Sequence, residues 1–329
     1  MHLSDFDYNL PKELIAQYPL KARDSARLMV LDRKSQSIEH RAFRDITGYL
    51  KKGDLFVLND TKVLRSRLKG RRVSGGKVEV LLLNHKERLT FRALIKPARI
   101  KIGETISFGN DEISGLISAK NEITFHVEKP GSVYEAGVMP LPPYIKREPE
   151  ELDNHYYQTI YANHEGAIAA PTAGLHFTKE LMQRMESAGI KFASLTLHVG
   201  YATFKPVKEE DITKHNMEPE CFKIPQGAIT ALSQAEENKS RVFAVGTTSL
   251  RALESYSLGN KEGYTDLFIY PGYKFRLVSC LLTNFHLPRT TLFILACAFG
   301  GAEFIRRAYA EAVKKKYRFY SYGDAMLII

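Results

Sequence analysis

The chain has 329 residues, of which 44% are hydrophobic, 26% charged and 11% aromatic. This length exceeds what one compact core usually holds and suits two domains. The composition is that of a globular protein, which excludes a disordered tail protein and a coiled coil. Lys and Arg number 47 against 37 Asp and Glu, so the formal net charge is +10.

The cysteines and the N-terminus indicate the compartment. Cys221, Cys280 and Cys297 are scattered singly, without the spacing of a zinc site or a disulfide framework, so we expect a reducing environment and no metal. The N-terminus lacks the basic start and apolar run of a signal peptide. The longest apolar stretch, residues 292–299, is far shorter than the roughly 20 residues that cross a bilayer. We therefore expect a cytoplasmic protein with no membrane partner.

The first 128 residues contain two patterns. Apolar runs predict a strand at residues 27–31, a helix through Phe43, Ile46 and Leu50, and a strand at residues 54–58. Shorter runs then follow, separated by Gly, Asn or Lys and without helical periodicity, and these predict a small all-β module of five or six strands. The runs are residues 78–83, 89–95, 105–108, 112–117 and 123–127.

The charge excess lies in this β module. Between residues 61 and 102, thirteen Lys and Arg are opposed only by Glu79 and Glu87, a net charge of +11, so the rest of the chain sums to −1. A basic segment on a near-neutral body predicts a partner that carries many phosphates. The alternative is that the strands expose cations for solubility. The basic residues are Lys62, Arg65, Arg67, Lys69, Arg71, Arg72, Lys77, Lys86, Arg88, Arg92, Lys96, Arg99 and Lys101.

After prolines 140, 142 and 143, which mark a boundary, helices and strands alternate. Thr178 is the expected N-cap of a helix at residues 179–188 that Gly189 ends. Strands are expected at residues 192–199, 241–245, 267–270 and 277–281, and further helices after the turn at residue 246, from about residue 291, and at residues 303–316.

This order of elements predicts an α/β main domain, as a barrel-like or an open sheet, with an inserted small all-β barrel. Residues 1–60 and 148–329 would form the α/β domain, and residues 61–147 the insertion.

Three histidines lie at predicted strand ends or beside helix starts, where α/β proteins build their sites: His176, His198 and His286. A single such histidine is more often a structural residue, but three in comparable positions make a functional role as probable as a structural one. They lack the spacing of a zinc site.

The turn Gly246-Thr247-Thr248-Ser249 leads from a strand into a helix. Its backbone N–H groups would bind a carboxylate or phosphate, and Arg251 in the first turn strengthens that interpretation. The alternative is an ordinary N-cap. Because the chain lacks GxGxxG, P-loop and GxSxG motifs, dinucleotide, nucleoside triphosphate and serine hydrolase sites are disfavoured.

Six strings in order resemble the S-adenosylmethionine:tRNA ribosyltransferase-isomerase family of queuosine biosynthesis. They are LNDTKV (58–63), AAPTAGLHFT (169–178), LHVGYATFKPV (197–207), VGTTSLRALES (245–255), TNFHLP (283–288) and YRFYSYGDAM (317–326). The resemblance covers the whole chain, and it departs from the family pattern at Tyr201 and at Arg289-Thr290.

The resemblance implies an α/β domain with an inserted β-barrel. It also implies an enzyme whose partner is tRNA carrying 7-aminomethyl-7-deazaguanine at the wobble position. The ribosyl group of S-adenosylmethionine, a substrate rather than a resident cofactor, would move to the aminomethyl group and isomerise to epoxyqueuosine, releasing adenine and methionine. No metal and a monomer are expected.

Such a reaction needs a base beside the sulfonium and an acid for the leaving adenine. We expect His176 and His198 to be this pair, because imidazole serves both roles near neutral pH. The other expected catalytic residues are Asp60, Arg251 and Glu254. Expected substrate-binding residues are Thr172, Gly174, Phe177, Thr247, Thr248, Ser249, Asn284, His286, Tyr322 and Asp324, although a lone Phe beside a motif is more often core. Arg65, Arg67, Lys69, Arg71 and Arg72 are the expected tRNA-binding residues.

Two other hypotheses remain open. A base-exchanging tRNA transglycosylase would require a zinc-binding Cys/His cluster, which the sequence lacks. A non-catalytic RNA-binding protein would use the basic module alone and would leave the His, Asn and Arg motifs unexplained.

Overall fold

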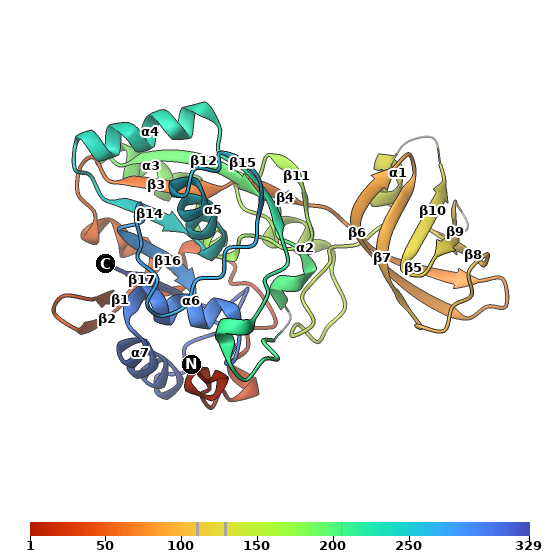
Figure 1. Cartoon of the computed structure of the whole chain (residues 1–329), viewed down its shortest axis with the longest axis horizontal. Coiled ribbons are helices and arrows are strands. Elements are labelled where there is room, and N and C mark those ends of the chain that lie inside the picture. The colour runs from red at the N-terminus through yellow and green to blue at the C-terminus, as the bar shows by residue number, and fades with distance from the viewer. Residues whose placement is uncertain (110–111, 128–129, 205) are drawn as a thin grey trace.

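The computed structural model describes residues 1–109, 112–127, 130–204 and 206–329 (Figure 1). The larger lobe is built on a nine-stranded sheet with the order β15-β13-β12-β3-β14-β16-β17-β1-β2, and a closed six-stranded barrel projects from it as the smaller lobe. The main domain is therefore an open sheet. The predicted inserted all-β barrel is confirmed.

The sheet contains β1 (Arg27–Asp32), β2 (Ser37–Ala42), β3 (Leu55–Asn59), β12 (Lys191–Leu197), β13 (Glu220–Lys223), β14 (Val242–Val245), β15 (Glu262–Thr265), β16 (Cys280–Asn284) and β17 (Ala325–Ile328). The α-helices of this lobe are α2 (Glu151–Tyr156), α3 (Lys179–Ser187), α4 (Gln226–Glu237), α5 (Thr247–Ser257), α6 (Thr291–Gly300) and α7 (Ala302–Lys314). Short 3-10 helices include η4 (Phe43–Tyr49) and η5 (Thr172–His176).

The barrel contains β5 (Arg67–Arg72), β6 (Lys77–Glu87), β7 (Thr90–Lys96), β8 (Thr105–Phe108), β9 (Ile113–Ala119) and β10 (Glu122–His126), and α1 (Pro130–Glu135) follows it. At the junction of the lobes, β4 (Thr61–Val63) pairs with β11 (His164–Ala167).

Four neighbouring strands at the centre of the sheet, β12, β3, β14 and β16, run parallel. Their carboxyl ends therefore meet along one edge, which is where open α/β sheets bind ligands. β17 runs antiparallel to β16 and places Ala325 opposite Asn284. The residues just before β17 consequently reach the same edge.

Helices cover the sheet on both faces because the side chains of each strand alternate. Leu55 and Val57 of β3 belong to the core that α4, α5, α6 and α7 cover, whereas Phe56 and Leu58 belong to the core under α3 and η4. All five residues of β3 are buried, as expected for a central strand of a parallel sheet.

The same alternation keeps the barrel core apolar and its surface basic. In β5, Leu68 and Gly70 are buried, whereas the basic residues at alternate positions from Arg67 to Arg71 face outward. A Cβ atom at Gly70 would lie 2.7 Å from the side chains of Ile106 and Phe108, so the core leaves room only for glycine there.

The chain returns from the barrel along residues 139–146, here called the strap. Leu141 and Ile145 of the strap pack with Val63 and Tyr157, and the Arg67 Nη2 atom donates to the Leu141 carbonyl at 2.8 Å. The strap and the β4–β11 pair thus hold the barrel against the body. Among the described residues, no helix has the length and apolar character needed to traverse a bilayer.

Most of the strands and helices expected from the sequence are present. The Thr178 Oγ1 atom accepts from the Leu181 amide at 3.1 Å as the N-cap of α3, as predicted. The expected strand at residues 267–270 is wrong: these residues form a loop, and Leu267, Phe268 and Tyr270 pack on the core without strand pairing. The helix expected around residue 46 is the 3-10 helix η4.

Candidate active site

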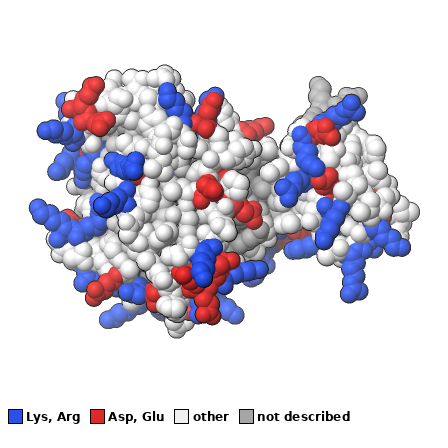
Figure 2. All heavy atoms as spheres, in the orientation of Figure 1, with Lys and Arg blue, Asp and Glu red and all other residues white. Residues whose placement is uncertain are grey.

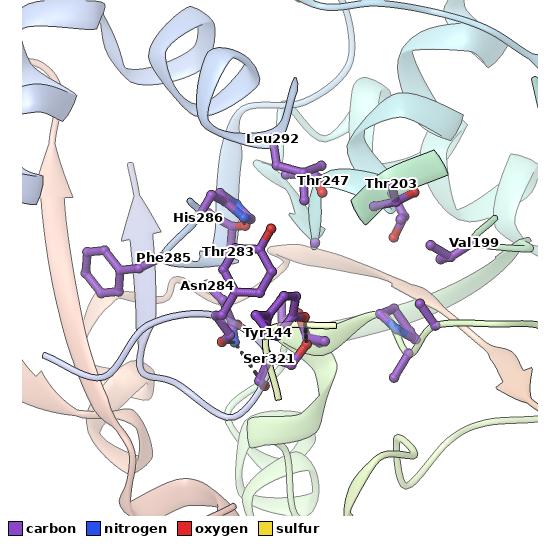
Figure 3. Close-up of a pocket in the computed structure, with 18 residues that line it drawn as sticks. Tyr144, Val199, Thr203, Thr247, Thr283, Asn284, Phe285, His286, Leu292 and Ser321 are labelled. Atoms are coloured by element: carbon purple, nitrogen blue, oxygen red, sulfur yellow. Dashed lines mark hydrogen bonds between the residues drawn. The ribbon is translucent and has the colours of Figure 1, made fainter. Parts of the chain in front are cut away.

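A pocket opens at the carboxyl edge of the sheet (Figure 3), and we call it the edge pocket. Its walls are residues 169–173, 246–248 and 283–286, together with Tyr144, Val199, Thr203, Leu292, Tyr320 and Ser321. Its volume is about 50 Å³, which is room for only a few water molecules. It therefore encloses only part of a nucleoside-sized ligand.

The N-terminus of α5 forms one wall of the edge pocket. Gly246 precedes it with φ of +90°, a left-handed conformation that favours glycine. Thr247 and Thr248 line the pocket, and the unpaired N–H groups of a first helical turn attract anions. Ser249 lies deeper, where its Oγ atom donates to the Val245 carbonyl at 2.7 Å. Residues 246–248 of the predicted anion-binding turn therefore line the edge pocket, and Ser249 does not.

Asn59, at the end of β3, hydrogen-bonds to residues of β12, β4 and α5. Its Nδ2 atom donates to the Leu197 carbonyl at 2.9 Å and to Thr248 Oγ1 at 3.3 Å. Its Oδ1 atom accepts from the Leu197 and Thr61 amides at 3.0 and 3.2 Å. The sequence predicts the neighbouring Asp60 as the site residue instead. The signal for Asn59 was an amide at the end of an otherwise apolar strand.

His286 is the predicted histidine that lines the edge pocket. Its Nε2 atom lies 2.8 Å from Thr283 Oγ1, its amide donates to the Tyr309 hydroxyl at 3.0 Å, and its carbonyl accepts from the Tyr8 hydroxyl. Burial lowers the pKa of His286 to about 3. The ring is therefore neutral at pH 7.

His176 contacts Asn284 but does not itself line the edge pocket. Its Nε2 atom is 3.1 Å from Asn284 Oδ1, while the Asn284 Nδ2 atom donates to the Tyr320 carbonyl at 2.8 Å. We assign the Nε2 proton to His176, because the Asn284 oxygen can only accept. Burial is the main cause that lowers the pKa of His176 to about 4. His176 thus orients Asn284, and Asn284 lines the edge pocket.

His198 and Asp60 lie together beside the β4–β11 pair. His198 Nδ1 is 2.8 Å from Thr61 Oγ1, and burial, followed by the charge of His164, lowers the pKa of His198. Asp60 Oδ1 accepts from the Thr196 hydroxyl at 2.6 Å, and Oδ2 lies 3.8 Å from His164 Nε2. Within the described ranges, no three His, Cys, Asp or Glu side chains are grouped to hold a metal ion.

Arg251 acts on the edge pocket through Glu220. The two form a buried ion pair, and Arg251 also donates to the carbonyls of Leu267 and Thr265. The Glu220 Oε1 atom accepts from the Gly200 amide at 2.9 Å and from the Thr203 hydroxyl at 3.0 Å. Since Thr203 lines the pocket, Arg251 positions its wall instead of meeting a ligand carboxylate.

Glu254 and Asp324, the other acidic residues in the motifs, are anchors for the backbone. Glu254 is fully buried and accepts from the Arg276, Leu277 and Val278 amides at 3.0 to 3.2 Å. Asp324 accepts from the Arg27 and Arg318 amides at 2.9 and 2.8 Å. Their carboxylates hold the loops before β16 and β17 in place.

The remaining expected ligands separate into two groups. Thr172 lines the edge pocket, and Gly174 lies beneath it, where a Cβ atom would be 2.0 Å from the Tyr161 hydroxyl. Phe177 is fully buried in the core under α3, which leaves no ring face for a base. Tyr322 donates to Asp153 Oδ1 at 2.7 Å.

The structure adds Tyr144 to the site and explains the two departures. The Tyr144 hydroxyl, from the strap, lies 2.5 Å from Ser321 Oγ across the edge pocket; no sequence signal linked these residues. Tyr201 lies where the barrel meets the body. Arg289 pairs with Asp7 at 2.5 Å, and Thr290 is the N-cap of α6.

Comparison with known proteins identifies the family. The sequence model of the family described as "Queuosine biosynthesis protein" matches residues 3–328. The chain belongs to this queuosine biosynthesis family. Its members include the S-adenosylmethionine:tRNA ribosyltransferase-isomerases of Sulfurihydrogenibium sp. and Aquifex aeolicus, which are 52% and 49% identical to it over 100% of both chains.

A solved structure agrees with this family assignment. The crystal structure of S-adenosylmethionine tRNA ribosyltransferase from Thermotoga maritima is similar with a TM-score of 0.59 and 37% identity. The similarity covers 99% of this chain and 100% of that one. The resemblance to the queuosine family found in the six motifs is confirmed.

Replacing Arg251 by alanine should lower the free energy of unfolding by about 3–5 kcal/mol, because it leaves Glu220 buried and unpaired. The double variant Arg251→Met/Glu220→Leu should lose less, since it leaves no buried charge. Urea unfolding measures both. The control is Arg41→Ala, which removes an exposed partner of Glu39 and should change stability by less than about 1 kcal/mol. A loss that small for Arg251→Ala would contradict the positioning role.

The two buried histidines predict a loss of stability in mild acid. Folding lowers the pKa of His286 to about 3 and of His176 to about 4, from the ordinary 6.5, so the unfolded chain binds more protons between about pH 4 and 6.5. Their contribution is complete above pH 6.5 and falls as the pH is lowered, by about 1–2 kcal/mol per histidine at pH 5.

This dependence is measured by urea unfolding at pH 7, 6 and 5. His286→Asn should flatten the decline, whereas His155→Asn, at an exposed position, should leave it unchanged. A decline of equal steepness in wild type and His286→Asn would contradict the assignment.

Proposed function

We propose that this chain is an S-adenosylmethionine:tRNA ribosyltransferase-isomerase of the queuosine pathway. It transfers the ribosyl moiety of S-adenosylmethionine to the aminomethyl group of 7-aminomethyl-7-deazaguanine in tRNA and isomerises it to epoxyqueuosine, releasing adenine and methionine. The family match over residues 3–328, with relatives of that name aligned over their full length, carries the proposal. The enzyme would act where tRNA is modified, in the cytoplasm.

The edge pocket suits the methionine end of S-adenosylmethionine. The N–H groups of Thr247 and Thr248, at the start of α5, would hold the carboxylate. Because the pocket has a volume of only about 50 Å³, the ribose and adenine would extend beyond it.

His286 would remove the proton from the 5′ carbon beside the sulfonium. It lines the edge pocket, and its ring is neutral at pH 7. Because its pKa is about 3, it is a weak base, and the step would depend on the acidity that the positive sulfur gives the 5′ carbon. His176 would position Asn284. His198 and Asp60 would serve on the side of the β4–β11 pair, where the chain leads into the barrel.

A groove across the barrel would hold the tRNA backbone, and Figure 2 shows Lys and Arg side chains over this lobe. The groove has a volume of about 1010 Å³, and Arg71 and Lys77 line it without a side-chain partner among the described residues. The other four expected tRNA-binding residues have protein partners. Arg65 and Arg67 donate to the carbonyls of Glu135 and Leu141, and Lys69 and Arg72 pair with Glu148 and Glu104.

The proposed reaction predicts adenine release that depends on the modified base. The protein is mixed with S-adenosylmethionine and tRNA bearing the aminomethyl base, and adenine is measured by chromatography. The control tRNA carries guanine at the wobble position and should give no adenine. Binding of the modified tRNA without adenine release would contradict the proposal and favour the non-catalytic RNA-binding hypothesis.

The unpaired cations predict the salt dependence of tRNA binding. Arg71→Gln/Lys77→Gln should weaken binding and reduce the slope of log K against log salt by about 1.5, because two phosphate contacts are lost. The matched control Arg72→Gln/Lys86→Gln removes two cations already paired with Glu104 and Glu122 and should have a smaller effect. Equal effects of the two double variants would contradict the distinction between unpaired and paired cations in tRNA binding.

A further inference from the structure

A second cavity, which the function proposed above leaves unoccupied, lies between the barrel and the body. It has a volume of about 340 Å³, within the range of small-ligand sites, and we call it the junction cavity. The barrel contributes Arg67, Glu79 and Lys96, among others, and the strap contributes residues 140–143, 145 and 146. Ile168 and Tyr201 close it on the side of the body.

The junction cavity and the edge pocket share a wall. Tyr144 of the strap lines the edge pocket, whereas its neighbours Pro143 and Ile145 line the junction cavity. Likewise, Ile168 lines the junction cavity and its neighbour Ala169 lines the edge pocket. The Ile168 amide donates to the Val199 carbonyl at 3.1 Å across this wall. A ligand that extends from the edge pocket past this wall therefore comes close to one held in the junction cavity.

The polar groups of the junction cavity are only partly used by the protein: Arg67 donates to the Leu141 carbonyl and forms an ion pair with Glu79. The Glu79 carboxylate has no hydrogen bond among the described residues, and Arg67 Nη1 lies 3.7 Å from it, beyond hydrogen-bond distance. The Nε atom of Arg67 is buried without a partner. Glu79 and Lys96 also line the barrel groove, so they lie where the groove meets the cavity.

Glu79 lies opposite Lys69 and Lys96 in the barrel ladder, and a carboxylate at this place opposes the binding of phosphates. Glu79 and Glu87 are the two acidic residues between residues 61 and 102. Glu87 is exposed at the far end of β6, whereas Glu79 faces the cavity. A carboxylate accepts two parallel hydrogen bonds from neighbouring donors, and a guanine-type base presents such a pair, the ring N1–H and the 2-amino group.

We propose that the junction cavity receives the flipped-out 7-aminomethyl-7-deazaguanine base of the tRNA, and that Glu79 reads its N1–H and 2-amino groups. This inference rests on the function proposed above. Enzymes that act on a base extrude it into a pocket and read its Watson–Crick edge there. The aminomethyl group leaves the ring on the side opposite that edge, so with the edge at Glu79 the amine points toward the edge pocket and S-adenosylmethionine.

The test removes the proposed hydrogen bond between Glu79 and the 2-amino group, once by changing the base and once by changing Glu79. Adenine release is measured with tRNA bearing the aminomethyl base and with the same tRNA whose base lacks the 2-amino group. In the wild type, loss of the 2-amino group should lower kcat/KM by about 10- to 100-fold, because it leaves a carboxylate oxygen unpaired. The ratio of kcat/KM with and without the 2-amino group measures this penalty. In Glu79→Leu this ratio should fall to about threefold or less. Glu79→Gln, which keeps one acceptor, should give an intermediate ratio.

Glu87→Leu, on the same strand but outside the cavity, is the matched control and should keep the ratio of the wild type. If the wild type releases no adenine from either tRNA, the proposed function fails and the inference fails with it. If the wild type releases adenine but shows no penalty for the missing 2-amino group, or if Glu79→Leu and Glu79→Gln keep the full penalty, the inference is overturned while the function stands.

Discussion

The point where β3 and β12 separate controls the geometry of the site. Parallel strands that diverge leave backbone amides and carbonyls without ladder partners, and burying such groups unpaired is costly. The Asn59 amide fills this place, bonding to both backbone groups of Leu197, to the Thr61 amide and to Thr248 Oγ1. One side chain thereby sets the start of β4, which leads to the barrel, and the start of α5, which lines the edge pocket.

Around this point the buried carboxylates of Glu254, Asp324 and Glu220 hold loops in place. Glu254 and Asp324 accept backbone amides ahead of β16 and β17, and Glu220, paired with Arg251, holds Gly200 and Thr203. The edge pocket itself is consequently lined by hydroxyls, an amide and a neutral imidazole. Among the described residues, such a lining places no Asp, Glu, Lys or Arg side chain against a bound substrate.

Several cations of the barrel are also paired within the protein. Arg72 and Lys69 are neutralised by Glu104 and Glu148, and Arg67 connects the barrel to the strap. Only part of the +11 charge of residues 61–102 is then free for a polyanion. Because the strap touches both the junction cavity and the edge pocket, the module that would hold tRNA and the pocket that would hold S-adenosylmethionine meet along one segment.

The sequence by itself determined the family, the inserted barrel and the strands of the parallel sheet, because these depend on local periodicity, on turn residues and on motif strings that are contiguous in the chain. It also placed the three histidines at strand ends or beside helix starts. Only the tertiary structure decided which of these residues face a cavity. Arg251 meets Glu220 31 positions away, His176 meets Asn284 108 positions away, and Tyr144 meets Ser321 177 positions away. Such partners are brought together by sheet order and by the path of the strap, and no local pattern in the chain records them.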